Sequence, residues 1–172
     1  MKEAIRQRAR ELGFDDCRFT TAAAPDHSPA LQKWLAEKRH GEMAWLERNA
    51  EKRIDPQKVL AEARSVITLA TSYETKTRVT EDEKGKTGVI ARYARYADYH
   101  DVLREPLKSL TDFVNQSGAD TRSLWYVDTG PLLERDFAQR AGLGFVVKHT
   151  NLISARLSNW IFLPDMLTTL EL

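Results

Sequence analysis

The chain of 172 residues has little thiol chemistry available to it, because it contains one cysteine, Cys17. One thiol cannot form a disulfide within the chain, and it cannot supply the set of cysteines that holds zinc or an iron–sulfur cluster. No apolar run approaches the ~18 residues of a transmembrane helix. The N-terminal stretch MKEAIRQRARELG also lacks the apolar core of a secretory signal. These absences predict a cytoplasmic protein with no membrane span.

An excess of charge of either sign is also missing. The 26 Lys and Arg nearly balance the 25 Asp and Glu, so the formal net charge is +1 at pH 7. A nucleic-acid partner would therefore need a local basic surface. With 42% hydrophobic and 30% charged residues, and only 8 Gly and 6 Pro, the composition is that of an ordinary globular protein. The length predicts a single domain, residues 1–172, with one sizeable core.

Helical and strand patterns alternate along the chain. Helices are predicted over 2–12, from Ser28–Pro29 through Leu35, around 43–46, from Asp55–Pro56 to about 63, from Asp98 to near 118 and over 131–141; strands are predicted over 14–20, 65–73, 88–94, 121–128 and about 160–163. Residues 74–87 are charged and poor in apolar side chains, which predicts a flexible surface loop. No glycine-rich phosphate motif follows a strand, so the order favours a mixed α/β or α+β fold over a doubly wound dinucleotide fold.

Pro106 lies inside the helical pattern that starts at Asp98. A proline there removes one backbone hydrogen bond and clashes with the preceding turn, at a cost of ~3 kcal/mol. We therefore predict that the helix kinks or ends at Pro106.

The segment YVDTGPLLER, residues 126–135, places a lone carboxylate, Asp128, between a strand and a helix. One interpretation is structural: the carboxylate accepts from the first backbone N–H groups of the following helix. The other is chemical: at the mouth of a cleft, a carboxyl whose pKa is raised by burial can act as a general acid. The residue pattern alone leaves both open.

Two further segments concentrate side chains that bind ligands. RYARYADYH, residues 92–100, combines three tyrosines and two arginines, which suits either aromatic packing with exposed arginines or a flat, amide-rich or anionic ligand. FVVKHT, residues 145–150, sets Lys148 and His149 beside apolar residues. His100 and His149 do not have a spacing typical of zinc ligands, so no metal site is predicted.

Taken together, several segments in a fixed order resemble the N-terminal, cobalamin-binding domain of the epoxyqueuosine reductases, which act in tRNA queuosine biosynthesis. These segments are GEMAWLERNAEKRIDP (41–56), ARSVITLATSY (63–73), ARYARYADYH (91–100), YVDTGPLLER (126–135) and AGLGFVVKHTNLIS (141–154). The resemblance covers nearly the whole chain. It implies an α+β, nitroreductase-like sandwich with a mostly antiparallel sheet and flanking helices, a fold shared with the cobalamin domain of reductive dehalogenases. It also implies a base-off cobalamin and, as substrate, epoxyqueuosine in the anticodon loop of a tRNA.

The same resemblance implies roles for individual residues. Asp128 matches the aspartate of the VDTGP motif, expected to donate a proton to the epoxide oxygen and to lie at the cofactor. The expected cobalamin contacts are Arg53, Tyr93, Tyr99, His100, Lys148, His149 and Thr150.

Three features depart from the family pattern. The family continues into a ferredoxin-like module with two [4Fe–4S] clusters, whereas this sequence ends about where those cysteines should begin, so the chain alone is expected to be inactive. Val147 stands where the family commonly has glycine, and its side chain could crowd a corrin ring. Pro106 interrupts a helix that the family usually leaves unbroken. A corrinoid-binding module without catalysis and a tRNA-binding module are the alternative functions.

Overall fold

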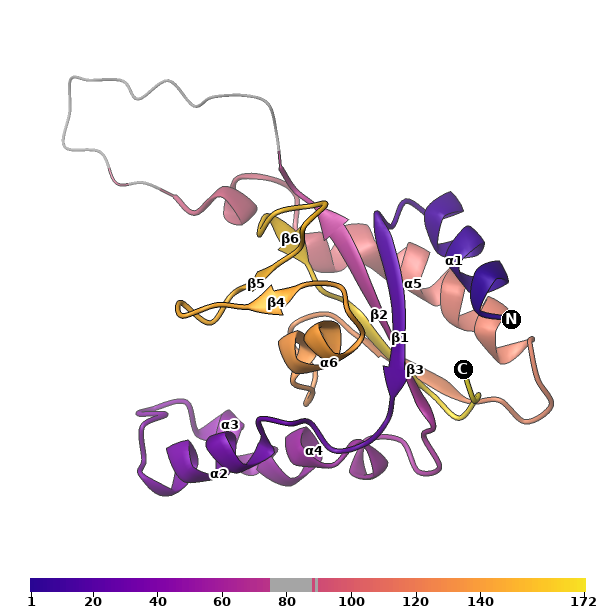
Figure 1. The fold of residues 1–172 in the computed structure, drawn as a ribbon. Coiled ribbons are helices and arrows are strands. Elements are labelled where there is room, and N and C mark those ends of the chain that lie inside the picture. The colour runs from indigo at the N-terminus through magenta and orange to yellow at the C-terminus, as the bar shows by residue number, and fades with distance from the viewer. Residues whose placement is uncertain (75–87, 89) are drawn as a thin grey trace.

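A computed structural model describes residues 1–74, 88 and 90–172 (Figure 1). The predicted loop over 74–87 falls almost entirely outside the described residues. In chain order the elements are α1 (Lys2–Glu11), β1 (Asp16–Thr21), α2 (Ser28–Ala36), α3 (Ala44–Arg48), α4 (Ala50–Ile54), the 3-10 helix η1 (Pro56–Lys58), β2 (Ser65–Ser72), the 3-10 helix η2 (Arg92–Arg95), α5 (Tyr99–Asn115), β3 (Ser123–Tyr126), α6 (Glu134–Arg140), β4 (Phe145–Val146), β5 (Leu152–Ile153), β6 (Ile161–Phe162) and β7 (Asp165–Thr168).

One antiparallel sheet organises the chain. Its strands lie in the order β1-β2-β7-β3, β6 pairs with the end of β2, and β4 and β5 form a separate hairpin. Each of these pairings is antiparallel. The predicted α+β class, a mostly antiparallel sheet with flanking helices, is therefore confirmed. None of the helices in the described ranges is long and apolar enough to cross a membrane.

Helices cover both faces of the sheet, and β2 contributes to the core on each face. On one face, Ile67 and Leu69 pack with Ile5 of α1 and with Leu107 of α5. On the other face, Val66 packs with a cluster that includes Phe137 of α6. The alternation follows from the period of two in a strand, and burial on both faces explains why residues 65–70 lack exposed positions. Figure 1 shows α1 and α5 on one side of the strands and α6 with the β4–β5 hairpin on the other.

Several predicted elements differ in the structure. Residues 92–95 form a 3-10 helix instead of part of a strand over 88–94. The helix predicted from Asp55–Pro56 is a single 3-10 turn, although Asp55 does accept from the Gln57 N–H as a cap. His27, not Ser28, precedes α2 as its N-cap. The strand β7, which was not predicted, lies in the interior of the sheet between β2 and β3.

The helix α5 runs through Pro106, so the prediction that Pro106 would end it is wrong. The carbonyl that loses its N–H partner belongs to Val102, the residue four positions earlier. Val102 lies on the exposed face, where water can bond that carbonyl. On the opposite face Leu103, Leu107 and Leu110 are buried, and this packing offsets the cost of the proline.

Candidate functional site

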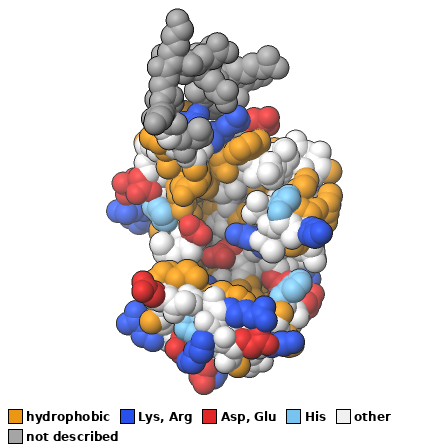
Figure 2. Space-filling model, turned by 90° about the vertical axis from the view of Figure 1, so that its left-hand side faces the viewer, with side chains coloured by type: hydrophobic (Ala, Val, Ile, Leu, Met, Phe, Trp, Pro, Cys, Tyr) orange, Lys and Arg blue, Asp and Glu red, His pale blue; other side chains and the backbone are white. Residues whose placement is uncertain are grey.

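A cavity of about 550 Å³ opens between the end of the sheet, the start of α6 and the β4–β5 hairpin. Its lining residues are Tyr73, Tyr93, Tyr99, Val127, Asp128, Glu134, Arg135, Asn151, Leu152, Asn159, Trp160, Ile161, Phe162 and Leu163. This volume lies within the usual range for small-molecule and cofactor sites. Figure 2 shows the hollowed face, with hydrophobic side chains around the hollow and acidic ones within it. The predicted site residues Tyr93, Tyr99 and Asp128 therefore share one cavity.

Asp128 lies two residues after β3, in the left-handed backbone region with φ of 57°. Its Oδ2 atom accepts a hydrogen bond of 2.7 Å from the Tyr99 hydroxyl at the start of α5. The helix α6 begins at Glu134, three residues later than predicted, and no side chain caps it. The interpretation of Asp128 as the cap of that helix is therefore wrong, and its hydrogen bond is with a cavity residue.

Tyr99 is held by rings on both sides. It stacks on His100 and on Phe162, each at 4.1 Å between ring centroids, and meets Tyr93 edge-on at 6.4 Å. Asp98 fixes this start of α5 as predicted, because its side chain accepts from the His100 backbone N–H. Burial raises the pKa of Tyr99, and the Asp128 hydrogen bond raises it further. Tyr99 therefore remains a neutral donor to Asp128 at neutral pH.

Glu134, the first residue of α6, lines the same cavity. It is half-buried, and its Oε1 atom is buried without a hydrogen-bond partner in the described part of the chain. Burial raises the pKa of Glu134 to about 7. The hydrogen bond from its own backbone N–H opposes this rise, the Asp128 carboxylate adds to it, and Arg53 and Arg135 oppose it more weakly. Glu134 therefore carries a proton for a large part of the time at neutral pH.

Asp165 begins β7 behind the cavity wall and is fully buried. Thr68 of β2 lies directly opposite it, yet in the described chain neither Asp165 oxygen has a partner in hydrogen-bonding geometry, and nor does the Thr68 hydroxyl. Burial raises the pKa of Asp165 well above its usual range, and Glu134 raises it further, while Thr68 opposes the shift. Asp165 therefore holds a proton to a higher pH than an exposed aspartate does.

The remaining predicted contacts lie around the cavity rather than on its lining. Arg53 donates to the Leu132 carbonyl oxygen at 3.2 Å, and its buried Nε has no partner among the described residues. His100 backs Tyr99, and its Nδ1 lies 2.8 Å from Asp98 Oδ1. The carbonyl oxygen of Thr150 accepts a hydrogen bond of 2.8 Å from Arg135 Nη1.

Lys148 and His149, also predicted, are exposed in the connection between β4 and β5. His149 Nδ1 accepts from the backbone N–H of Asn151 at 3.3 Å, and Asn151 lines the cavity. Val147 lies in the same connection and is half-buried, but it is not part of the lining. The structure thus brings the KHT segment to the rim of the cavity.

Gly130 lets the chain turn closely over Tyr126. A Cβ at this position would overlap the Tyr126 ring, the nearest contact being its Cγ. Val127 and Gly130 are both buried, so the turn that presents Asp128 is fixed on either side of it. The glycine of the TG pair is therefore required by close approach rather than by a positive φ.

Sequence reasoning missed Glu134, Asp165 and the aromatic wall made by Tyr73, Trp160 and Phe162. Glu134 is the first residue of α6, whereas the predicted helix over 131–141 placed it inside the helix. Asp165 was missed with its strand, whose four residues are too few for a clear alternating pattern. The signal that was available is the apolar run around Trp160 followed by Pro164, which marks a strand edge.

Within the described ranges, no three His, Cys, Asp or Glu side chains are grouped so as to hold a metal ion. Cys17 is buried on the far face of β1, and burial raises the pKa of its thiol to about 12. It is therefore inert toward metals and nucleophilic chemistry at neutral pH.

Comparison with known proteins places these features in a family. Residues 53–129 match the family model described as Epoxyqueuosine reductase QueG, DUF1730. An epoxyqueuosine reductase of Gloeobacter violaceus is 42% identical over 170 residues, which is 98% of this chain and 52% of that protein. The Escherichia coli epoxyqueuosine reductase is 32% identical over 174 residues, covering 100% of this chain and 46% of that protein. The chain thus spans about half the length of these relatives.

Solved structures agree with the sequence matches. The epoxyqueuosine reductase of Streptococcus thermophilus superimposes with a TM-score of 0.84 at 29% identity, covering 100% of this chain and 46% of that one. An epoxyqueuosine reductase bound to an epoxyqueuosine-modified tRNA-Tyr stem loop has a TM-score of 0.81 at 32% identity. The match covers 98% of this chain and 45% of that one. A B12-dependent reductive dehalogenase shares the fold, with a TM-score of 0.57 at 14% identity over 97% of this chain and 19% of that one.

Proposed function

The chain belongs to the epoxyqueuosine reductase family, and we propose that it forms the cobalamin-binding part of such an enzyme, with Asp128 as the proton donor to the epoxide oxygen. The observation that carries this proposal is the Tyr99–Asp128 hydrogen bond inside the aromatic-lined cavity. A carboxyl group turned away from any capping role and toward a ligand-sized space has the position that a general acid requires.

The cavity suits a flat ring with a polar periphery. Tyr93, Trp160 and Phe162 give it an aromatic wall that can pack against a macrocycle. Asn151 and Asn159 offer amide groups that pair with the amide side chains of a corrinoid. We infer that Tyr93 and Tyr99 contact the ring.

The remaining proposed cobalamin contacts, Arg53, His100, Lys148, His149 and Thr150, lie around the cavity and would hold the periphery and tail of the cofactor. The support for this set is its position, since none of these side chains belongs to the lining itself.

Removing an epoxide oxygen as water consumes two electrons and two protons. Bound cobalamin would supply a cobalt centre that delivers electrons to the epoxide carbon. Asp128 gives its proton to the epoxide oxygen as the carbon–oxygen bond breaks, and the negative charge that develops on that oxygen is thereby neutralised. Tyr99 orients Asp128 through the Oδ2 atom, which leaves the other carboxyl oxygen, Oδ1, to carry the proton.

The proposed substrate is an epoxyqueuosine nucleotide in the anticodon loop of a tRNA. A relative of similar fold was solved with an epoxyqueuosine-modified stem loop, which supports this assignment. A loop nucleotide can be turned out of its stack and reach a cavity that a helical stem cannot enter. The electrons would come from a ferredoxin-like module with iron–sulfur clusters, which we expect the chain to need for turnover.

Mixing the purified chain with cobalamin tests the binding half of the proposal. A change in the visible absorbance of the cofactor, saturating at one equivalent, is expected. An unchanged spectrum at any protein concentration would favour a module that binds tRNA only.

The Asp128→Asn variant tests the catalytic half, in the chain joined to the remaining half of a full-length relative. Asparagine keeps the shape and the left-handed backbone but has no acidic proton, so turnover should be lost while the cobalamin spectrum persists. Asp120→Asn is a matched control, because Asp120 is also exposed with φ of 58° but lies outside the cavity. Equal turnover in the two variants would remove Asp128 from the mechanism.

A further inference from the structure

The proposed reaction needs two protons, and Asp128 carries one. Asp128 is exposed in the structure, but cofactor and substrate bound in the cavity would cover it and would slow its reprotonation by solvent. The second proton must then come from a group already inside the protein. The following inference rests on the proposed function and concerns where that proton is kept.

Glu134 lines the same cavity as Asp128, and Asp165 lies on the sheet face that α6 covers. In the β2–β7 pairing Asp165 is opposite Thr68, and opposed residues of an antiparallel pair project from the same face. Val66, two residues before Thr68, packs under Phe137 of α6, so this is the face that α6 covers. Glu134 is the first residue of α6 and lines the cavity. Each of these two residues therefore has a place between the cavity and the sheet.

Neither group has the full set of partners that an ionised carboxylate needs, although the backbone N–H of Glu134 favours its ionised form. Glu134 Oε1 and both Asp165 oxygens are buried without hydrogen-bond partners in the described part of the chain. The charged groups that act on Glu134 are Asp128, Arg53 and Arg135, and Asp165 is coupled to it from the sheet side.

Of these neighbours, Arg53 and Arg135 are positively charged. Arg53 donates a hydrogen bond to the Leu132 carbonyl oxygen, and Arg135 donates one to the Thr150 carbonyl oxygen. Three carboxylates together would leave buried charge uncompensated, at a cost of several kcal/mol for each isolated ion. The cluster therefore retains at least one proton.

We propose that Glu134 is a positioning residue that stores the second proton and passes it to Asp128 after Asp128 has protonated the substrate. The O–H bond of the Glu134 carboxyl breaks and one forms on the Asp128 carboxylate, so the negative charge moves from Asp128 to Glu134. This step is a proton transfer without any change of oxidation state. Glu134 regains a proton from solvent when the product departs. Asp165 is fully enclosed, and burial favours its protonated form. In that form it would add no negative charge beside Glu134.

A carboxyl titration of the 172-residue chain, followed by carbon NMR, tests the storage of the proton without cofactor or substrate. The Glu134 resonance should titrate near pH 7 in the wild type. In Asp128→Asn its midpoint should fall, because the negative charge beside it is gone.

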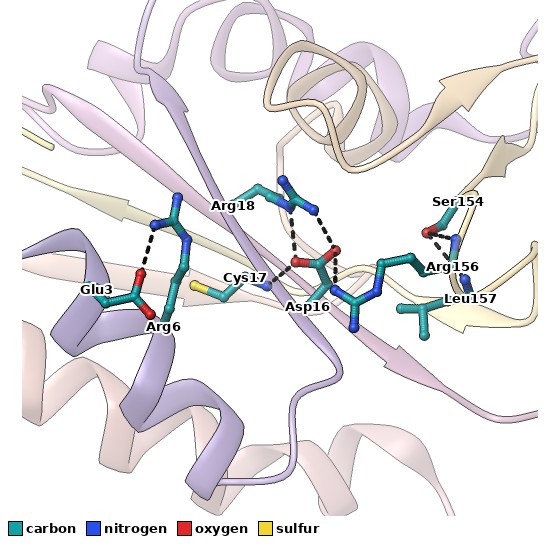
Figure 3. Close-up of polar contacts among 8 residues, drawn as sticks. All are labelled: Glu3, Arg6, Asp16, Cys17, Arg18, Ser154, Arg156 and Leu157. Carbon is teal, nitrogen blue, oxygen red and sulfur yellow. Dashed lines mark hydrogen bonds and ion pairs between the residues drawn. The ribbon is translucent and has the colours of Figure 1, made fainter.

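Asp16→Asn is the matched control for this titration. It also removes a buried carboxylate on the same sheet, but one held by Arg18 and facing Arg156 (Figure 3), and it should leave the Glu134 midpoint in place. A Glu134 midpoint in the ordinary glutamate range, or one that Asp128→Asn does not move, would overturn the proposal.

The pH profile of epoxide reduction separates this proposal from the proposed function. In the chain joined to the other half of a relative, wild-type turnover should fall as pH rises through 7. Glu134→Gln should lower turnover about a hundredfold, which is the low end of what a positioned acid contributes. The fall in turnover as pH rises through 7 should also disappear. Glu134→Asp, which keeps a carboxyl, should restore part of it.

A Glu134→Gln enzyme with the wild-type profile, beside an inactive Asp128→Asn, would refute the proton store alone. An active Asp128→Asn would instead refute the proposed acid.

Discussion

Two aspartates begin the strands on either side of β2, and they have opposite surroundings. Asp16 pairs with Ala70 and Asp165 with Thr68, two residues apart on the same strand, so both side chains project from the face that α6 covers. Asp16 is 8% exposed and Asp165 is 0% exposed.

Asp16 is fully bonded. It accepts from the Cys17 backbone N–H at 2.8 Å and from Arg18 Nε and Nη2 at 2.9 and 3.2 Å, and Arg156 Nη1 lies 3.7 Å away. Figure 3 shows both arginines directed at this carboxylate. Asp165 has no comparable donor among the described residues. Similar positions on one sheet thus give Asp16 two arginine partners and leave Asp165, whose pKa burial raises, without a partner in the described chain.

The largest effect that we expect from this difference is on the pH dependence of the free energy of unfolding. A carboxyl with a higher pKa in the folded than in the unfolded chain binds a proton on folding, so the free energy of unfolding falls as pH rises between the two values. For Glu134, whose pKa rises from 4.5 to about 7, that fall is roughly 3 kcal/mol between pH 4.5 and 7.5.

Glu134→Gln should remove this part of the slope in urea unfolding at a series of pH values. His27 also contributes to the pH dependence of stability, because its hydrogen bond to Asp136 raises its pKa. Its contribution is the same in both proteins and cancels in the difference. Identical slopes in the two proteins would place Glu134 with Asp16 as an ordinary ionised carboxylate.

Gly130→Ala tests whether the turn that carries Asp128 is as fixed as the geometry indicates. The new Cβ would overlap the Tyr126 ring, and overpacking of this kind typically costs about 1–3 kcal/mol. Cobalamin binding should weaken as Asp128 is displaced. Gly142→Ala is the control, because its Cβ meets open space and only the φ of 74° is unfavourable. Wild-type cobalamin binding in Gly130→Ala would show that the turn can give way.

Asp16→Asn should cost about 1 kcal/mol in the free energy of unfolding, measured in urea at pH 7. The carboxylate is buried, but Arg18 is 38% exposed, so solvent screens much of the ion pair. The loss should shrink in high salt, as expected for a charge pair. Asp165→Asn should show a weaker salt dependence, because burial favours the protonated, uncharged form of this carboxyl. A similar salt response in the two variants would erase the distinction between these aspartates.

Tyr99→Phe is expected to have the smallest effect on stability. The ring stacking on His100 and Phe162 is kept and only the hydroxyl bonded to Asp128 is lost, so the cost should be about 0.5–1 kcal/mol. Thermal unfolding at pH 7 measures it. A much larger loss would mean that Tyr99 and Asp128 are coupled to the core and not confined to the site.

The sequence predicted the parts of the fold that have long periodic patterns. The helix from Asp98 and the buried strand at 65–73 were placed correctly, because seventeen and eight residues give several repeats of the apolar spacing. The strand β7 has four residues and no repeat to detect. The segment at 92–95 contains one strand-forming residue, Tyr93, and forms a 3-10 turn.

The candidate site followed the same rule. Asp128, Tyr93 and Tyr99 could be predicted from segments that resemble a family, and the structure brings them into one cavity. Glu134 and Asp165 could not be predicted, because the rise in their pKa depends on burial between α6 and β7. These two elements are separated in the chain by β4, β5 and β6 and come together only in the fold. Propensity and spacing describe neighbours along the chain, whereas desolvation depends on neighbours in space.

Infrared spectroscopy of the carboxyl groups at neutral pH tests the central claim most directly. A protonated carboxylic acid has a carbonyl stretch that an ionised carboxylate lacks, so the wild-type chain at pH 7 should show this band. The band should lose intensity in Asp165→Asn and in Glu134→Gln and be unchanged in Asp16→Asn. A wild-type spectrum without the band, or a band that neither Asp165→Asn nor Glu134→Gln diminishes, would contradict the claim that a proton is held behind Asp128.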